Sequence, residues 1–535
     1  MHGLFGSYEV KTNWDLTRFA GSNYVTRNYE TEVFTLTQVT LTKFLSDKYF
    51  VEHDGCFIAT EGVLFEADSA EQAIARYRSG ETVFWKHWRG SFCGVLYDKK
   101  AERLIVFNDQ IGSKMLFYSF DHGEFVFASD LQILAQHFDN RLPQETFIEA
   151  LLDRGYSSDA KTAVQGIFRL TAGDYIQIEK GHFIKQPYYR FDNTPRDYDE
   201  ETMLSETNRL FRQAVARVVK KNEAEGLQHY FPLSGGLDSR LCQFVAHEIA
   251  TAPIVNYTYS QRGHYDHVLP QEISRALGNK WQFMALDGGD YLRQIDAIAG
   301  ATEWLINYNG PSEIYAFASQ QDWTHKGVVL TGVNGDNILS VITDHRHEIG
   351  LLYSLSFAGN GLGSPLVLQH YTESYSPFCD VDVLDYVLHI PTKKRHNYRF
   401  YDRLLLRYYP QAAEWHHKHE QIGHRQTIVT LAGRDMPLRD VPKRMMMYLL
   451  KQLHLYDAYG LDGESMNPYD QWIKSNPQLA ECFNEYYAQN KHLLPPRFTA
   501  ECETMMQIGS VTEKNKVLTV LSALKALSGS GESGR

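Results

Sequence analysis

Residues 231–240 read "FPLSGGLDSR", and this stretch decides the fold of the region around it. It joins a short apolar run, "HYFPL", to a longer amphipathic run, "RLCQFVAHEI", so we expect a β-strand, a tight turn and an α-helix. Glycines let the backbone of such a turn approach a ligand closely, and the free N–H groups at the start of the helix face it. A strand-to-helix turn of this kind binds anions, phosphates above all.

The acidic residue in the turn narrows the choice of ligand. Asp238 would repel a bare phosphate, so we expect a Mg²⁺ ion to bridge the two. The turn is not the G-x-x-x-x-G-K-[ST] phosphate loop, because Leu237 and Asp238 stand where that loop has its lysine. A turn that merely connects two elements is the alternative, and the specified positions weigh against it: Ser234, Gly235, Gly236, Leu237, Asp238 and Ser239.

Strands and helices alternate on either side of this turn. A helix over Glu201–Lys221 precedes it, and "PIVNYTY", "LPQEISRALG", "WQFMAL" and "GVVLTG" follow as strand, helix, strand and strand. Alternation at this spacing indicates βαβ units and a parallel sheet. Beyond about Phe357 the chain reads as mainly helical, so residues 200–527 are predicted to form one α/β domain.

The first 192 residues differ and read as mostly β. Three hairpins are predicted, in "GSFCGVLYDKKAERLIVFND", "SKMLFYSFDHGEFVFASD" and "TAGDYIQIEKGHFIKQPYY", with helices near residues 131–137 and 143–152. The Pro- and acid-rich "DNTPRDYDEE" that follows is predicted to be a linker. We therefore expect a separate domain over residues 1–192, and a flexible tail over 528–535, "SGSGESGR".

Composition limits the function classes. At 535 residues the chain is too long for one core, and 43% hydrophobic with 22% charged residues is ordinary globular composition. A net charge of −12 argues against a nucleic-acid binder. The six cysteines are scattered without a C-x-x-C pair, which suits reduced thiols. With no signal pattern and no apolar run of about 18 residues, we expect a soluble cytoplasmic protein with no membrane partner.

The turn motif S-G-G-L-D-S resembles the signature of the PP-loop ATP pyrophosphatases. Within them the chain is similar to the asparagine synthetase family over nearly its whole length, and "GSFCGVLYDKKAERLIVFNDQIGSKMLFYS" resembles that family's glutaminase domain. The resemblance implies an α/β protein with an N-terminal Ntn-hydrolase-like αββα sandwich. It also implies a C-terminal PP-loop domain, like the adenine nucleotide alpha hydrolases, with a parallel sheet and a helical end.

Further motifs carry the family's site residues onto this chain. "LTGVNGDNI" resembles the second metal-binding loop, "TESYSPFCD" resembles E-x-R-x-P-F-L-D, and "YYPQAAEWHHKHEQIG" places Lys418 on the family's lysine. The implied ATP and pyrophosphate site comprises Leu233, Ser234, Gly235, Gly236, Leu237, Asp238, Ser239 and Gly332, with Asp238 and Asp336 as ligands of Mg²⁺. Lys418 would stabilise the phosphates or the amide-forming transition state, and Glu373 would be a base or orient the substrate. A solvated loop lysine and a helix-capping glutamate are the alternatives.

The implied chemistry is the ATP-dependent formation of an amide. A substrate carboxylate attacks the α-phosphate of ATP, giving an acyl-adenylate and pyrophosphate, and an amine then displaces AMP. Charge grows on the departing pyrophosphate, so two aspartates with Mg²⁺ and one lysine are suitable stabilisers.

The glutaminase half departs from the family pattern at three places. Glutamine-dependent members carry a cysteine at position 2, where its own α-amine is the base, and this chain has His2 behind a Met1 that we expect to remain. Glu61-Gly62-Val63-Leu64-Phe65-Glu66 replaces N-G-E-I-Y-N, and Arg89 replaces an aspartate before G-x-F. We expect an inactive glutaminase; a new catalytic role for His2 is the alternative. The amine would come from free ammonia, from a partner's glutaminase, or from the substrate, as in the β-lactam synthetase and lasso-peptide cyclase branches.

The synthetase half departs on the acceptor side, where Asn337 follows Asp336 in place of an acid and Tyr375 replaces the arginine of E-x-R-x-P. Our first hypothesis is an amide-forming ligase for a specialised small-molecule, peptide or sugar-acid carboxylate. The second is an asparagine synthetase that uses ammonia or a partner's glutaminase. The third is a nucleotide-binding pseudoenzyme, which the retained motif residues argue against.

Overall fold

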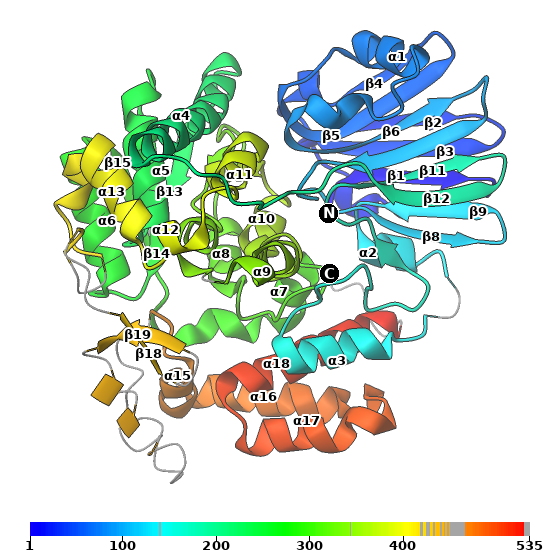
Figure 1. The fold of residues 1–535 in the computed structure, drawn as a ribbon. Helices are drawn as coiled ribbons and strands as arrows, with labels where there is room; N and C mark the ends of the chain where they lie inside the picture. Colours follow the sequence, from blue (N-terminus) through cyan, green and yellow to red (C-terminus); the bar gives the residue numbers. More distant parts are fainter. Residues whose placement is uncertain are drawn as a thin grey trace.

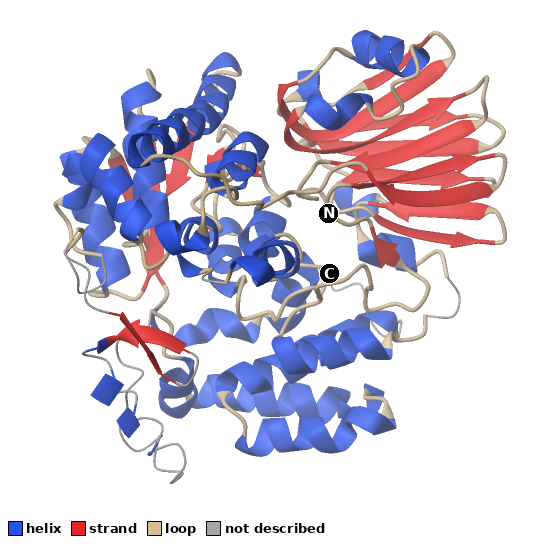
Figure 2. Cartoon of the chain, in the orientation of Figure 1, coloured by secondary structure: helices blue, strands red, loops and turns tan. Residues whose placement is uncertain are grey.

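The computed structural model describes residues 1–138, 141–342, 344–417, 421–423, 428–431, 434–438, 441–442, 445–446, 449 and 466–528. Two kinds of architecture lie side by side. Strands dominate the N-terminal part, and helices dominate the rest (Figure 2). The two parts meet along a broad seam that the chain crosses between β12 (His182–Pro187) and α4 (Glu200–Ala224) (Figure 1).

The N-terminal part is built from two six-stranded antiparallel sheets. The first has the order β10-β8-β9-β1-β3-β2, with β1 (Gly3–Tyr8), β2 (Tyr24–Glu30), β3 (Phe34–Leu41), β8 (Phe117–Asp121), β9 (Glu124–Ala128) and β10 (Phe168–Arg169). The second has the order β12-β11-β7-β6-β5-β4, with β4 (Phe50–His53), β5 (Cys56–Glu66), β6 (Arg89–Asp98), β7 (Arg103–Asn108) and β11 (Asp174–Glu179). The three predicted hairpins are confirmed as β6–β7, β8–β9 and β11–β12.

The sheets pack face to face because each buries one apolar face. Leu4, Phe57 and Val95 belong to the core between them. Helix α1 (Ala70–Arg78) packs on the outer face of the second sheet together with Trp85 and Trp88. Helix α2 (Leu131–Ala135) lies against the first sheet in the same core as Phe5 and Phe117. Helix, sheet, sheet and helix thus form the expected αββα sandwich.

The second part contains the predicted parallel sheet. Strands β13 (His229–Pro232), β14 (Ile254–Ser260) and β15 (Lys280–Ala285) run parallel in that order, and helices α5 (Leu237–Ile249) and α6 (Tyr265–Ala276) connect them. A second parallel pair, β16 (Val329–Leu330) with β17 (Ser374–Tyr375), lies beside it. The alternation read from the sequence is confirmed, and α6 begins four residues before the predicted "LPQEISRALG".

Helices fill most of the remaining chain, as expected beyond Phe357. They are α7 (Ile295–Ala301), α8 (Ser312–Ala318), α9 (His345–Leu351), α10 (Gly363–Leu368), α11 (Val381–Val387), α12 (Thr392–Arg395), α13 (Arg399–Tyr408), α15 (Tyr469–Ser475), α16 (Pro477–Asn490), α17 (Pro496–Ile508) and α18 (Val511–Leu527), with a hairpin of β18 (Ile428–Leu431) and β19 (Arg434–Pro437).

The last helix ties the two parts together. Helix α18 is apolar on most of its circumference and is buried against α3 (Glu145–Arg154), α16 and α17 (Figure 1). Lys516 on α18 donates to the carbonyl oxygens of Leu152 at 3.2 Å and Asp153 at 2.6 Å, in the last turn of α3. The predicted division at residues 192 and 200 stays a prediction, and the predicted tail lies outside the described residues after Ser528.

Two further sequence observations have counterparts in the structure. All six cysteines are free, and five of them are buried. In the described ranges no single helix has the length and apolar character of a membrane span, although the bent pair His345–Ser356 and Asn360–Leu368, which meet at 44°, passes that test when taken together.

Buried charges line the seam between the two parts. The Nζ of Lys114, in the loop after β7, donates to Glu373 at 2.6 Å across the seam, and both side chains are almost fully buried. Lys48 lies between two acids, 3.6 Å from Glu61 and 4.0 Å from Glu373. His2 lies 3.4 Å from Glu61 on its other side. These five side chains, Lys114, Glu373, Lys48, Glu61 and His2, form a continuous series of polar contacts, which we call the seam network.

Other ion pairs reinforce the seam nearer its edge. Arg89 at the start of β6 bonds to Asp382 on α11 at 2.7 Å. Arg217 on α4 contacts three acids: Glu66 at 2.9 Å, Asp380 at 2.6 Å and Asp382 at 2.7 Å. Two of these pairs, Arg89 with Asp382 and Glu66 with Arg217, join the N-terminal part to the rest of the chain. They help to hold the two parts in a fixed relative position.

We predict that Lys114→Met lowers the stability of the protein sharply. Removing one partner of a buried pair costs about 3–5 kcal/mol, and Glu373 would keep only its longer contact to Lys48, at 4.0 Å. The matched control is Lys99→Met, because Lys99 pairs with Glu52 at 2.7 Å but is 39% exposed, and an exposed pair contributes about 0–1 kcal/mol. Thermal unfolding of both variants measures the difference; equal midpoints would contradict the importance of the seam network.

Candidate active site

The turn between β13 and α5 is closed by its own side chains. Ser239 Oγ accepts the backbone N–H of Ser234 at 3.0 Å and lies 3.0 Å from Ser234 Oγ. Ser234 Oγ in turn accepts the N–H of Gly236, the residue that caps α5, at 3.2 Å. The two serines thus hold the turn rigid, with Leu233 and Leu237 anchored in the apolar core beneath it.

Two helices begin at this turn. Asp266, in the first turn of α6, accepts the N–H of Gly235 at 2.7 Å. Since α5 and α6 follow adjacent parallel strands, their positive N-terminal ends converge at the carboxyl edge of the sheet. That edge is where open α/β sheets bind ligands, and two helix starts favour an anionic one.

The fully buried guanidinium of Arg240 connects the turn to a later segment. It donates to the carbonyl oxygens of Gly235 at 3.0 Å, Ala412 at 3.1 Å, Trp415 at 2.9 Å and His416 at 3.0 Å. The hydroxyl of Tyr265 donates to the carbonyl oxygens of Gly235 and His416, each at 2.8 Å. The segment directly before Lys418 is therefore held on the turn. Lys418 itself lies outside the described residues, and its role stays a prediction.

The loop after β16, residues 332–336, is packed onto the same turn. A Cβ on Gly332 would lie 2.7 Å from the backbone N of Ser239, and one on Gly335 would lie 2.4 Å from Cγ of Asp238. Both positions are closer than any side chain allows, so glycine is required for the approach. The N–H of Asp336 then donates to Asp238 Oδ2 at 3.0 Å. The structure thus brings together the two aspartates that the sequence proposed as metal ligands.

The environment of the two aspartates suits a shared divalent cation. Tyr401 on α13 is buried beside them; burial raises the pKa of its hydroxyl well above the usual value, and Asp238, Cys242 and Asp336 raise it further. Asp238 and Asp336, which the backbone N–H of Asp336 holds next to each other, offer hard oxygen ligands of the kind Mg²⁺ takes. Among the residues that the structure describes, no group of three or more His, Cys, Asp or Glu could hold a metal. Phosphate oxygens or water would have to complete the shell around Mg²⁺.

Glu373 lies in a different environment from these aspartates. Its carboxylate accepts from Lys114 in the seam network, and its carbonyl oxygen accepts the N–H of Val329 at 2.8 Å. The structure gives it an ion-pair partner that the sequence did not predict, and its role as base or substrate orienter stays a prediction. The neighbouring Tyr375 donates to Asp380 at 2.7 Å.

A pocket opens between the two parts, next to the second loop. Gly90, Ser91, Ile111 and Ser113 form its N-terminal wall, and Thr331, Val333 and Asn334 belong to its opposite wall. It leaves about 50 Å³ for the centres of water molecules, which is room for several of them. We call it the interdomain pocket. The loop that holds Asp336 against Asp238 on one side therefore forms part of this pocket on the other.

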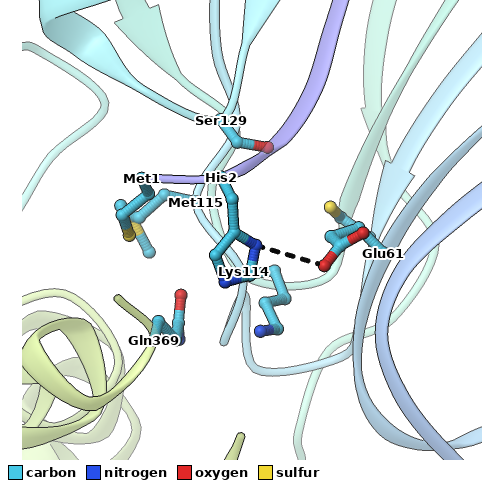
Figure 3. Close-up of a pocket in the computed structure, with 8 residues that line it drawn as sticks. Met1, His2, Glu61, Lys114, Met115, Ser129 and Gln369 are labelled. Carbon is cyan, nitrogen blue, oxygen red and sulfur yellow. Dashed lines mark ion pairs between the residues drawn. The ribbon is translucent and has the colours of Figure 1, made fainter. Parts of the chain in front are cut away.

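A second, smaller pocket surrounds His2 (Figure 3). It leaves only about 10 Å³ for the centre of a water molecule, the lower limit for one water. His2 points at Glu61 (Figure 3). Lys114 and Cys93 line the same space. Burial alone would raise the pKa of Glu61, but Lys48, His2 and Lys114 lower it to about 2. Burial also lowers the pKa of His2 and raises that of the Cys93 thiol well above its usual value.

Sequence reasoning missed three residues that shape the site. The position of Asp266 could have been predicted, because it follows β14, the strand next to β13. Loops after adjacent parallel strands meet at the same edge of the sheet, which brings Asp266 to the glycine turn. Arg240 is the last residue of the quoted stretch, yet nothing local shows which distant carbonyls it binds. Lys114 pairs with a residue 259 positions away, and no local pattern predicts that contact.

Two family models match the chain. Residues 58–189 match a glutamine amidotransferase domain, and residues 206–353 match asparagine synthase. The chain belongs to the asparagine synthetase family. The resemblance drawn from the sequence and the α/β fold class are thereby confirmed, and the two converging loops lie in, or next to, the asparagine synthase match.

Two curated relatives are similar to this chain at modest sequence identity. Asparagine synthetase [glutamine-hydrolyzing] 1 of Bacillus subtilis is 20% identical over 298 residues, 55% of this chain and 46% of that protein. Amidase chry2 of Gibberella zeae is 25% identical over 240 residues, 44% of this chain and 32% of that protein. The chain thus spans less than half the length of these curated relatives.

Among solved structures, a glutamine phosphoribosylpyrophosphate amidotransferase from B. subtilis is 9% identical and covers 53% of this chain and 91% of its own. Its TM-score is 0.25, so this likeness adds nothing to the fold described above.

We predict that Gly335→Ala disrupts the site of this asparagine synthetase relative. The added Cβ would collide with Asp238, and overpacking of this kind costs about 1–3 kcal/mol. We expect a lower unfolding midpoint and MgATP affinity weakened about tenfold, since 1.4 kcal/mol is a factor of ten. Gly350→Ala is the control, because its Cβ would meet nothing within 4 Å. Isothermal titration with MgATP measures the effect; unchanged affinity in Gly335→Ala would contradict the site.

Proposed function

We propose that this family member is an ATP-dependent amide-forming ligase that adenylates a substrate carboxylate and lacks glutaminase activity of its own. The observation that carries the proposal is the meeting of two loops, in which the Asp336 N–H donates to the Asp238 carboxylate beside two helix starts. The helix starts would bind the phosphates of ATP, the co-substrate that the family uses, and the two aspartates would hold the Mg²⁺ that accompanies them.

The proposed reaction has two balanced steps. A carboxylate oxygen of the substrate attacks the α-phosphorus of ATP, and the bond from that phosphorus to the bridging oxygen breaks, giving an acyl-adenylate and pyrophosphate. The nitrogen of an amine then attacks the acyl carbon, expels AMP and loses a proton. Asp238 and Asp336 would hold Mg²⁺, which neutralises charge on the departing pyrophosphate. The N–H groups in the first turn of α5 would bind phosphate oxygens, and Lys418 is proposed as the additional cation.

Glu373 is proposed to act in catalysis only through its partner. The ion pair with Lys114 fixes the residue directly before β17, so it would orient the strand that borders the interdomain pocket. We therefore favour a positioning role over that of a general base. The amine source is proposed to be free ammonia, a partner's glutaminase or an amine of the substrate, as in the β-lactam synthetase and lasso-peptide cyclase branches. We also propose a cytoplasmic location, which the six free cysteines favour.

An asparagine synthetase that uses ammonia is the second candidate, because the family match covers the segment that holds Asp238 and Asp336. The third, a nucleotide-binding pseudoenzyme, is disfavoured by the ordered contacts between the two loops.

Purified protein with ATP, Mg²⁺, aspartate and ammonium separates these candidates. Asparagine with stoichiometric AMP would establish the second candidate. MgATP binding without turnover, lost in Asp238→Ala, would support a ligase for another carboxylate. If MgATP does not bind at all, the ligase proposal fails and the third candidate must be revised to a role without nucleotide.

Asp336→Asn is expected to reduce pyrophosphate formation at least about 100-fold, because one of two metal-holding carboxylates is lost at the leaving group. Asp121→Asn, in an exposed hairpin turn, is the control and should keep full activity. Pyrophosphate release with the natural carboxylate, or exchange of labelled pyrophosphate into ATP, measures both. An active Asp336→Asn would remove this residue from the site.

We predict that His2→Cys does not restore glutaminase activity. Glu61, paired with Lys48, and Lys114, paired with Glu373, stay beside position 2 in this variant, and glutamine would have to displace these buried ion pairs. Release of glutamate from glutamine is the measurement, with retained MgATP binding as the control for folding. Glutamate formation by the variant would show that the N-terminal domain is still a competent glutaminase scaffold.

A further inference from the structure

We infer that the interdomain pocket binds the carboxylate substrate and that this substrate carries no charge apart from its reacting carboxylate. The inference rests on the proposed function and specifies its substrate class.

The interdomain pocket lies next to the proposed phosphate site. Thr331, Val333 and Asn334 belong to the loop that packs on Asp238, so a ligand in the pocket is separated from the proposed phosphate site by one loop. Asn334 has a left-handed backbone, φ 69°, which turns this loop between its two faces. A carboxylate reaching over the loop from the pocket would approach the α-phosphate of ATP.

The lining of the interdomain pocket is polar and apolar but uncharged. None of the seventeen described residues that line the pocket has a charged side chain. Hydroxyl and amide groups alternate with apolar ones, as Ser91 and Gln369 do with Ile111 and Leu362. Burial raises the pKa of Cys379 to about 11, so its thiol stays neutral. The described walls therefore offer hydrogen bonds and apolar contact, and no counter-charge.

Asp380 and Glu373, which lie behind the walls of the pocket, already have ion-pair partners. Asp380, which accepts from Tyr375, is also bound by Arg217 at 2.6 Å. Glu373, next to the lining residue Ser374, is bound by Lys114. A substrate ammonium or second carboxylate would have to displace one of these buried partners, leaving an unpaired charge. Aspartate carries both groups and is therefore a poor fit.

The N-terminal domain gains a function from this assignment. Ser91 and Ser113, whose hydroxyls lie 2.7 Å apart, and Ile111 form one wall of the pocket. The domain would contribute to substrate binding even without glutaminase chemistry.

Exchange of labelled pyrophosphate into ATP by the full-length protein tests the charge requirement. The first probe is L-aspartate. The other three are N-acetyl-L-aspartate α-methylamide, gluconate and phenylacetate, each of which carries one carboxylate and no other charge. We expect at least one of these three to support exchange at least about 100-fold better than aspartate, because burying an unpaired charge costs several kcal/mol.

Each outcome decides a different question. Exchange with aspartate at comparable or higher efficiency overturns the inference and leaves the ligase proposal standing. Exchange with no probe, in protein that binds MgATP and loses it in Asp238→Ala, also overturns the assigned substrate class. Absence of MgATP binding overturns the ligase proposal itself.

A matched pair of variants tests the location. Ile111→Trp fills the pocket from its N-terminal wall, and Ile184→Trp adds the same bulk on β12, where Ile184 is 46% exposed. Ile111→Trp should raise the KM for the active probe about tenfold or more with MgATP affinity unchanged, and Ile184→Trp should change neither. An unchanged KM in folded Ile111→Trp overturns the assignment of this pocket.

Discussion

The rest of the structure depends on one electrostatic constraint: charges buried at the seam must be paired. Lys114 and Glu373 meet there at 2.6 Å, out of contact with water. Burial would lower the pKa of Lys114, but Glu373 and Glu61 raise it above its usual value, so the lysine keeps its charge. Separating the two parts would expose or strand these charges, at a cost of several kcal/mol for each. The sandwich and the synthetase part are therefore fixed relative to each other, and a pocket formed by both has a constant shape.

The departures from the glutaminase pattern coincide with this seam. His2 and Glu61 belong to the seam network, Glu66 binds Arg217, and Arg89 binds Asp382. Of these four residues, Glu66 and Arg89 pair across the seam, and His2 and Glu61 have their contacts within the N-terminal part. Glu66 and Arg89, at two positions that depart from the family pattern, thus supply ion pairs that fix the interface, and the loss of glutaminase activity stays a proposal.

Local features of the fold were predictable, and distant pairings were not. The hairpins and the strand–turn–helix at Ser234–Ser239 follow from periodicity and turn chemistry within a few residues. The pairing of Asp238 with Asp336 followed from the motif resemblance, since both lie after strands of parallel pairs. The partner of Glu373 did not, because an ion pair over 259 positions depends on how two domains dock. The packing of α18 on α3 likewise crosses the predicted division of the chain, and Lys418 lies outside the described residues.

The loop over residues 332–336 connects the site at Asp238 with the interdomain pocket. On one side its glycines allow Asp336 to reach Asp238, and on the other side Val333 and Asn334 line the interdomain pocket. Val333 is held by Ser376, whose hydroxyl donates to its carbonyl oxygen at 2.7 Å, directly after the strand that Glu373 anchors to Lys114. A continuous series of contacts therefore runs from the N-terminal sandwich through β17 to the loop that carries Asp336. Through these contacts the docking of the N-terminal sandwich helps to fix the position of Asp336 beside Asp238.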